Sequence, residues 1–255
     1  MDVSIKHRTA AIQKSIETGE RAPLAWFDSR RYVQHNLALG DGFGALLEFL
    51  DSLPPGSSRV EAVRTFEDGE ISFAHLTYHL APMGEVVGFE VHRWEDGHVV
   101  EHWDNLQPLP DTANADGRTM TDGPVEAVDL ERTEANKELV RQYVGQILVD
   151  GDLPGVRRWV SDALVEHSPH RGDGAAALGA ALAAQRESGS VRYRTLHRVL
   201  GEGSFVLAMC EGELDGAPAA FYDLYRVEEG LVVEHWDVVE TIPERSAWAN
   251  DNGKV

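Results

Sequence analysis

The sequence predicts an α+β protein built from two tandem copies of one small domain. A repeated segment is the first observation: residues 97–104 and 230–237 both end in Val-Val-Glu-His-Trp-Asp, and they differ only at the residue after the glycine. The second is an upstream match between residues 34–42 and 166–174, which share a histidine and Gly-Asp-Gly. Because two matches in the same order rarely arise by chance, the chain is predicted to be a duplication.

In each copy, helical patterns come before strand patterns. Apolar residues recur at helical spacing first, and β-branched and aromatic segments separated by glycines follow. Helices grouped before an antiparallel sheet indicate an α+β layer fold. In copy one, helices are expected at 5–19, after Pro23 and at 43–50, and strands at 59–67, 70–80, 86–95 and 98–107. In copy two, helices are expected at 135–151 and 174–187, and strands at 191–200, 203–213, 218–228 and 231–241.

A linker separates the two copies. Residues 108–126 are rich in Pro, Gly, Asp, Asn and Thr and show no apolar period, which is typical of a loop. The predicted division is domain one at 1–118, a linker at 119–132 and domain two at 133–255.

The composition excludes some classes of partner. The 255 residues carry 23 Lys and Arg against 43 Asp and Glu, so the net charge is −20. This charge argues against binding to nucleic acid or to an anionic membrane surface, since both require clustered cations. Cys210 is the only cysteine, which excludes an intramolecular disulfide. The first residues lack the apolar stretch of a signal peptide, and the chain has no apolar run of about 20 residues, so we expect a cytoplasmic protein.

The repeated strand is expected to place a His and an Asp on one face of the sheet. Asp96-Gly97 is a strong signal for a two-residue hairpin turn. Counting outward from an uninterrupted hairpin puts His102 and Asp104 on the same face as Phe89 and Val91. The corresponding face of copy two carries Tyr222, Leu224, His235 and Asp237.

Two interpretations of this face are open. A His and an Asp at alternate positions facing a partly dry cavity are open to pKa tuning and could transfer protons. Alternatively, they only hold the strand end and a neighbouring loop. Trp103 and Trp236 lie on the other face, where they are expected to pack outside their own pocket, at a contact between the copies.

Copy one is richer in histidine than copy two. His75 and His79 share a strand face, and would line a His-rich cavity if that face looks inward. Imidazole is a good ligand for zinc, iron and copper, so a metal-dependent enzyme is an alternative. The sequence has no HExxH motif and no Cys/His cluster, and no cofactor or metal is predicted.

Several segments carry a resemblance to a known family. Those of copy one are Tyr32-Val33-Gln34-His35-Asn36, Gly40-Asp41-Gly42, 95–104 and Leu106-Gln107-Pro108-Leu109-Pro110. Those of copy two are Glu166-His167-Ser168-Pro169, Asp223-Leu224-Tyr225-Arg226 and 228–237. Together they resemble the SnoaL-like branch of the NTF2-like superfamily, which includes polyketide cyclases and ketosteroid isomerase.

This resemblance implies two cone-shaped α+β barrels, each with a pocket between its helices and a curved sheet. It places the face of His102 and Asp104 in the pocket, and His35 and Asn36 at the pocket wall. It also implies dimer formation through the convex sheet faces, within the tandem chain as a pseudo-dimer or between chains as a homodimer.

The implied function is cofactor-independent acid–base catalysis of the cyclase, isomerase or hydrolase type. The substrate would be a small, largely apolar carbonyl or epoxide compound. A non-catalytic small-molecule binding protein is the other alternative. The catalytic residues predicted are His35, His102, Asp104, His167, His235 and Asp237, and those predicted to bind substrate are Asn36, His75, His79, Phe89, Val91, Tyr222 and Leu224.

Overall fold

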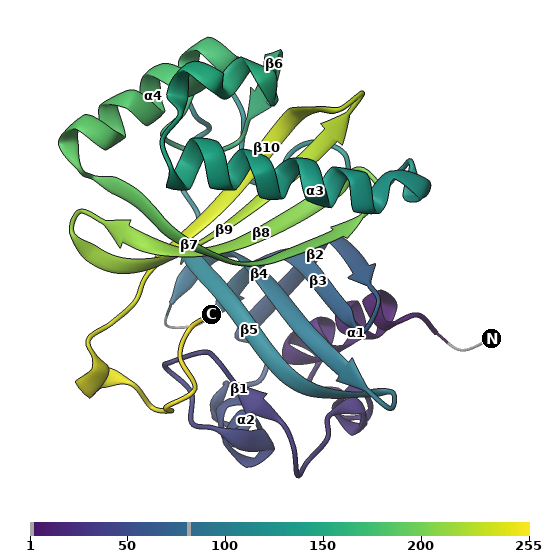
Figure 1. Cartoon of the computed structure of the whole chain (residues 1–255). Helices are drawn as coiled ribbons and strands as arrows, with labels where there is room; N and C mark the ends of the chain where they lie inside the picture. Colours follow the sequence, from purple (N-terminus) through teal and green to yellow (C-terminus); the bar gives the residue numbers. More distant parts are fainter. Residues whose placement is uncertain (1–2, 81–82) are drawn as a thin grey trace. The chain divides into compact units, whose positions relative to one another are not determined.

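The chain folds into two α+β units, and the computed structural model describes residues 3–80 and 83–255. Unit 1 comprises residues 1–109 and 243–255, and unit 2 comprises residues 110–242 (Figure 1). The linker, which follows copy one, therefore belongs to unit 2. Residues 243–255, which follow copy two, belong to unit 1. This division differs from the predicted one, in which residues 243–255 end domain two and residues 110–118 end domain one.

Unit 1 is a sheet covered by helices on one face. The sheet has the strand order β1-β5-β4-β3-β2, in which only β1 runs parallel to its neighbour β5. Its elements are α1 (Ile5–Thr18), η1 (Ala22–Trp26), β1 (Val33–Gln34), α2 (Gly42–Ser52), β2 (Ser58–Asp68), β3 (Ile71–Leu80), β4 (Gly84–Glu95), β5 (His98–Pro108) and, from the C-terminal segment, η5 (Arg245–Ala247).

Unit 2 has the same topology, with strand order β6-β10-β9-β8-β7 and β6 parallel to β10. Helices α3 and α4 lie on one face of this sheet (Figure 1). Its elements are η2 (Leu130–Arg132), α3 (Thr133–Tyr143), η3 (Val144–Val149), η4 (Leu153–Arg158), β6 (Val160–Glu166), α4 (Ala175–Ser188), β7 (Val191–Glu202), β8 (Phe205–Leu214), β9 (Ala217–Glu228) and β10 (Leu231–Thr241).

The hairpin turn between β4 and β5 is the predicted one. Asp96 and Gly97 both have positive φ, at 51° and 77°, and Glu95 pairs with His98. Positive φ at both central residues is the geometry of a type I′ turn, whose twist matches that of the flanking strands. The predicted α+β class is confirmed, but β1 precedes α2 and β6 precedes α4, so one strand of each sheet lies between helices in the sequence.

A β-bulge in each copy changes the predicted strand faces. In β5, Glu101 pairs with Arg93 but Val99 pairs with Trp94, so Val100 is an extra residue. A bulge shifts the register by one residue, and a shift of one reverses which side chains share a face. His102 consequently lies opposite His92 rather than Val91. The corresponding bulge in β10 falls at Val233 and places His235 opposite Tyr225.

The face prediction is therefore wrong for the β4 and β9 residues. Phe89 and Val91 lie on the sheet face opposite His102 and Asp104, and Phe89 stacks there on His75 with 4.5 Å between ring centroids. Tyr222 and Leu224 are displaced in the same way in unit 2.

Among the residues that the structure describes, no helix is long and apolar enough to cross a membrane.

Candidate functional site

Unit 1 contains a cavity of about 150 Å³ between its helices and the sheet. Apolar residues of α1, η1 and α2 form most of the wall. The polar part of the wall is formed by the sheet and by the chain around β1. The lining residues with polar groups are Gln13, Ser15, Tyr32, Gln34, Asn36, Tyr78, Glu90, His92, His102 and Asp104.

His102 and Glu90 form a buried pair on this wall. The Nε2 atom of His102 lies 2.5 Å from Oε2 of Glu90, and both residues are less than 10 % exposed. Glu90 also accepts hydrogen bonds from the hydroxyl of Tyr78, at 2.6 Å, and from the amide of Gln13, at 3.2 Å. Glu90 is therefore fixed in place by hydrogen bonds from three side chains.

The second nitrogen of His102 is fixed by Gln34. Oε1 of Gln34 accepts the backbone N–H of Asn36 at 2.8 Å, which identifies it as the amide oxygen. His102 Nδ1 lies 2.8 Å from the same oxygen and must therefore donate to it. Burial lowers the pKa of His102, but the charge and hydrogen bond of Glu90 outweigh this effect, so the pKa is raised above its ordinary value. His102 is therefore favoured as an imidazolium.

Asp104 is held ionised by a cation from the C-terminal segment. Lys254 Nζ lies 3.0 Å from Oδ1 of Asp104, and both side chains are buried. Asn36 donates to the other carboxylate oxygen at 2.5 Å. Burial raises the pKa of Asp104, but Lys254, His102 and Asn36 together lower it more, so the net shift is downward.

His92 is the third titratable group beside His102, and it is held neutral. It is 1 % exposed, its ring centroid lies 4.9 Å from that of His102, and its Nδ1 atom has no hydrogen-bond partner among the described residues. Burial, and then the charge of His102, lower the pKa of His92 well below its ordinary value. Glu90, His92 and His102 each offer a ligand atom within 4.8 Å of the others, so these three residues could hold a metal ion.

Unit 2 has a related polar centre with different chemistry. His235 lies between two carboxylates, 2.7 Å from Glu166 and 3.0 Å from Asp223. Burial lowers the pKa of His235, but Glu166 and Asp223 together raise it to about 10. Asp223, His235 and Asp237 also lie within 4.8 Å of one another. Arg171, buried in this centre, lies 3.9 Å from Asp237.

Several substitutions distinguish the two polar centres, and three of them surround the imidazole. Unit 2 has Glu166, Asp223 and Tyr225 where unit 1 has Gln34, Glu90 and His92. Tyr225 is buried and packs against Tyr143 and His235, which fills the space beside the imidazole. Only unit 1 therefore has a second imidazole beside the first.

The backbone N–H groups of His35 and His167 donate to the carbonyl oxygens of His102 and His235, but their rings make other contacts, and His35 does not line the cavity of unit 1. Nδ1 of His35 lies 2.9 Å from the carbonyl oxygen of Gly253, and Nε2 lies 3.0 Å from Glu101. His167 repeats this pattern with Thr119 and Glu234. Both rings also stack on the tryptophan of the repeated strand. The two histidines thus hold the segment that packs onto each unit.

The remaining predicted residues divide into two groups. Asn36 lines the cavity of unit 1 together with His102 and Asp104. Outside that lining lie His75, which contacts Arg64, and His79, which is exposed and pairs with Glu85. The β3 residues that line the cavity of unit 1 are Tyr78 and Leu80, on the strand face opposite His75 and His79.

Sequence reasoning missed Glu90, His92 and Lys254. If a bulge had been expected at the repeated Val-Val pair, the face count would have placed Glu90 and His92 beside His102, in place of Phe89 and Val91. Lys254 carries no sequence signal, because a segment far along the chain supplies it.

Comparison with known proteins finds similarity to solved structures that match one copy of the repeat. A ketosteroid isomerase homologue from Kribbella flavida is 18% identical, with a TM-score of 0.38, and the match covers 44% of this chain and 83% of that one. An epoxide hydrolase of M. tuberculosis is 19% identical, with a TM-score of 0.35, over 43% of this chain and 85% of that one.

A third structure, the polyketide cyclase candidate IdmH of Streptomyces antibioticus, is 16% identical, with a TM-score of 0.34, over 41% of this chain and 91% of that one. No family model and no curated protein sequence matches the chain. The structure itself shows two α+β units whose sheets share one strand order.

Proposed function

We propose that unit 1 is a cofactor-independent acid–base enzyme for a small, largely apolar carbonyl or epoxide compound. One observation carries this proposal: two adjacent imidazoles on the cavity wall, one held protonated and the other neutral. Surroundings that separate the pKa values of two neighbouring groups assign one as proton donor and the other as acceptor. The cavity volume suits a substrate about the size of one small ring, since an engineered apolar cavity of about 150 Å³ binds benzene.

In this proposal His102 is the proton donor and His92 the proton acceptor. Glu90 keeps His102 charged, and Gln34 fixes the orientation of its ring. His92 is free to accept a proton from a substrate carbon or from an attacking water. The amide of Asn36 and the Asp104–Lys254 pair set the field around the reacting atoms.

Exchange of hydrogen for deuterium tests this proposal without a known substrate. In D2O, the full chain is expected to accelerate exchange next to the carbonyl of small cyclic ketones, or hydrolysis of small epoxides, as followed by proton NMR. His102→Gln and His92→Gln should each lower the rate on the order of 100-fold, the usual contribution of a general acid or base. The matched control is His98→Gln, at the exposed hairpin turn, which should keep the full rate. Unchanged rates in both cavity variants, or no acceleration with any compound, would contradict the proposal.

A metal-dependent enzyme is the second candidate, supported by the proximity of Glu90, His92 and His102. The same assay separates the two candidates. Under the acid–base proposal the rate survives dialysis against a chelator. Loss of the rate on chelation and its recovery with zinc or ferrous ion would establish the metal-dependent candidate instead.

A further inference from the structure

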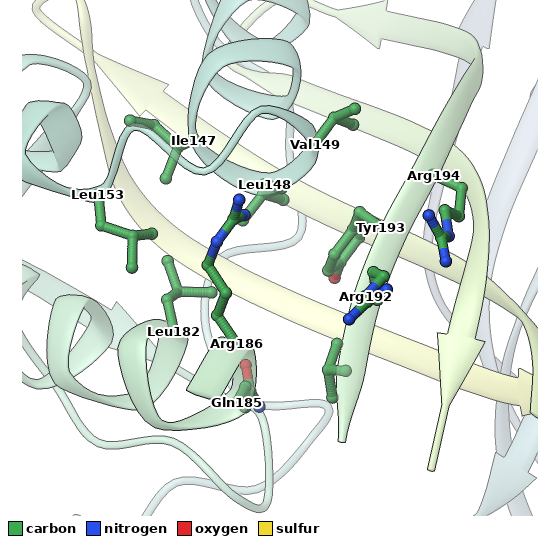
Figure 2. Close-up of a pocket in the computed structure, with 11 residues that line it drawn as sticks. Ile147, Leu148, Val149, Leu153, Leu182, Gln185, Arg186, Arg192, Tyr193 and Arg194 are labelled. Atoms are coloured by element: carbon green, nitrogen blue, oxygen red, sulfur yellow. The ribbon is translucent and has the colours of Figure 1, made fainter. Parts of the chain in front are cut away.

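A second cavity, in unit 2, combines an apolar interior with three arginines. It has a volume of about 400 Å³ and lies between η3, α4 and the edge strand β7. Its apolar side is formed by Ile147, Leu148, Val149, Leu153, Leu182 and Val191. Figure 2 shows Arg186 reaching from α4 toward η3, while Arg192 and Arg194 flank Tyr193 on β7.

The positive charge of this cavity is mostly uncompensated. Arg194 pairs with Glu213 at 2.8 Å, but Arg192 makes no ion pair with any described residue. Among the described residues, Arg186 makes one hydrogen bond, to the backbone carbonyl of Asp150 at 3.4 Å, and no ion pair. No described residue that lines the cavity carries a carboxylate, although the whole chain has a net charge of −20.

The guanidinium of Arg186 lies beside the backbone at Gly151. Gly151 has φ of 78°, and a Cβ atom there would come within 1.9 Å of the guanidinium of Arg186. The absence of a side chain at Gly151 therefore leaves the space that the guanidinium occupies. Gln185, also in the lining, has a buried Oε1 atom without a hydrogen-bond partner in the described part of the chain. A buried acceptor without a partner is costly, and a ligand donor would satisfy it.

The corresponding surface of unit 1 shows that the fold alone does not produce this charge. There, Lys14 pairs with Glu17 and Arg59 pairs with Glu85 around a cavity that Glu61 also lines. That cavity is lined by two cations and three carboxylates, whereas the unit 2 cavity is lined by three arginines and no carboxylate.

We propose that the cavity of unit 2 binds an amphipathic anion. A carboxylate or phosphate head group would lie between Arg186 and Arg192, since guanidinium groups bind both anions through paired hydrogen bonds. The apolar body would lie against Ile147, Leu153 and Leu182. This site borders the polar centre at His235 through Tyr193, whose hydroxyl donates to Asp223 at 3.1 Å, and it does not depend on the activity proposed for unit 1.

Calorimetric titration of the full chain with three eight-carbon compounds tests this site. Octanoate and octyl phosphate are expected to bind, and octanol at least about tenfold more weakly, because it lacks the charge that the arginines would contact. Tighter binding of octyl phosphate or of octanoate identifies the preferred head group. Equal binding of octanol, or no binding of either anion, would overturn the proposal.

Substitutions of the lining arginines test whether the anion binds in this cavity. Arg186→Gln and Arg192→Gln should each raise the dissociation constant of the preferred anion about tenfold. The control Arg141→Gln removes an exposed arginine that pairs with Glu138 on α3 and should change nothing. Wild-type affinity in both Arg186→Gln and Arg192→Gln would refute the site, and matching circular dichroism spectra verify that the variants are folded.

Discussion

Replacement of Lys254 by Met is expected to destabilise unit 1 by about 3 kcal/mol, the usual cost of removing one partner from a buried ion pair. Lys254 is 3 % exposed, and its ammonium is the cation that offsets the burial of Asp104. Because Met keeps the apolar length of the side chain, the loss of stability reflects the missing charge and not a cavity. Hydrogen exchange followed by mass spectrometry measures the loss for each unit separately, which a single unfolding transition of a two-unit chain does not.

Two further variants identify the cause of this loss. Adding Asp104→Asn to the Lys254→Met chain removes the uncompensated charge and should recover part of the stability. Lys14→Met, which removes an exposed lysine paired with Glu17, should cost less than about 1 kcal/mol. If Lys254→Met leaves the exchange of unit 1 unchanged, the C-terminal segment does not hold Asp104 in the way described.

Replacement of His235 by Gln is expected to destabilise unit 2 and to remove a pH dependence of its stability. The folded pKa of His235 is about 10, against an ordinary value of 6.5. A raised pKa means that the folded state holds the proton more tightly, so this contribution is complete below pH 6.5 and is lost as the pH rises through 10. This pKa shift corresponds to a contribution on the order of 3–5 kcal/mol to the stability of unit 2. In the variant, Glu166 and Asp223 lose the cation between them.

Denaturant unfolding from pH 6 to 10, with hydrogen exchange to assign the unit, measures this effect. In the wild type, the free energy of unfolding of unit 2 should fall across this pH range. In His235→Gln it should already be low at pH 6 and should change little with pH. His170→Gln removes an exposed histidine near this centre in sequence and should behave as wild type. A parallel pH dependence in wild type and His235→Gln would show that another group is responsible.

The fold could be predicted from the sequence because its signals are local and occur twice. The Asp96-Gly97 turn, the order of helices before strands and the repeated strand each depend on neighbouring residues. The short strands β1 and β6 were not predicted. β1 is only two residues long, and both strands pair in parallel with a strand far along the chain.

The site could be predicted only in part. His102, Asp104 and Asn36 follow from strand alternation and from the resemblance, and all three line the cavity. The bulge at Val100 removed Phe89 and Val91 from that face and brought in Glu90 and His92. Neither this bulge nor the contact of Lys254 with Asp104 has a local sequence signal. The predicted packing of Trp103 and Trp236 between the copies stays a prediction.

The central claim is that His102 and His92 are held in opposite protonation states, and NMR of the imidazole carbons and nitrogens tests it most directly. With both rings assigned through His102→Gln and His92→Gln, His102 should be an imidazolium at pH 7, with a pKa above 6.5. His92 should remain neutral well below pH 6.5. A neutral His102 at pH 7, or a common titration of the two rings near pH 6.5, would contradict the proposed donor and acceptor.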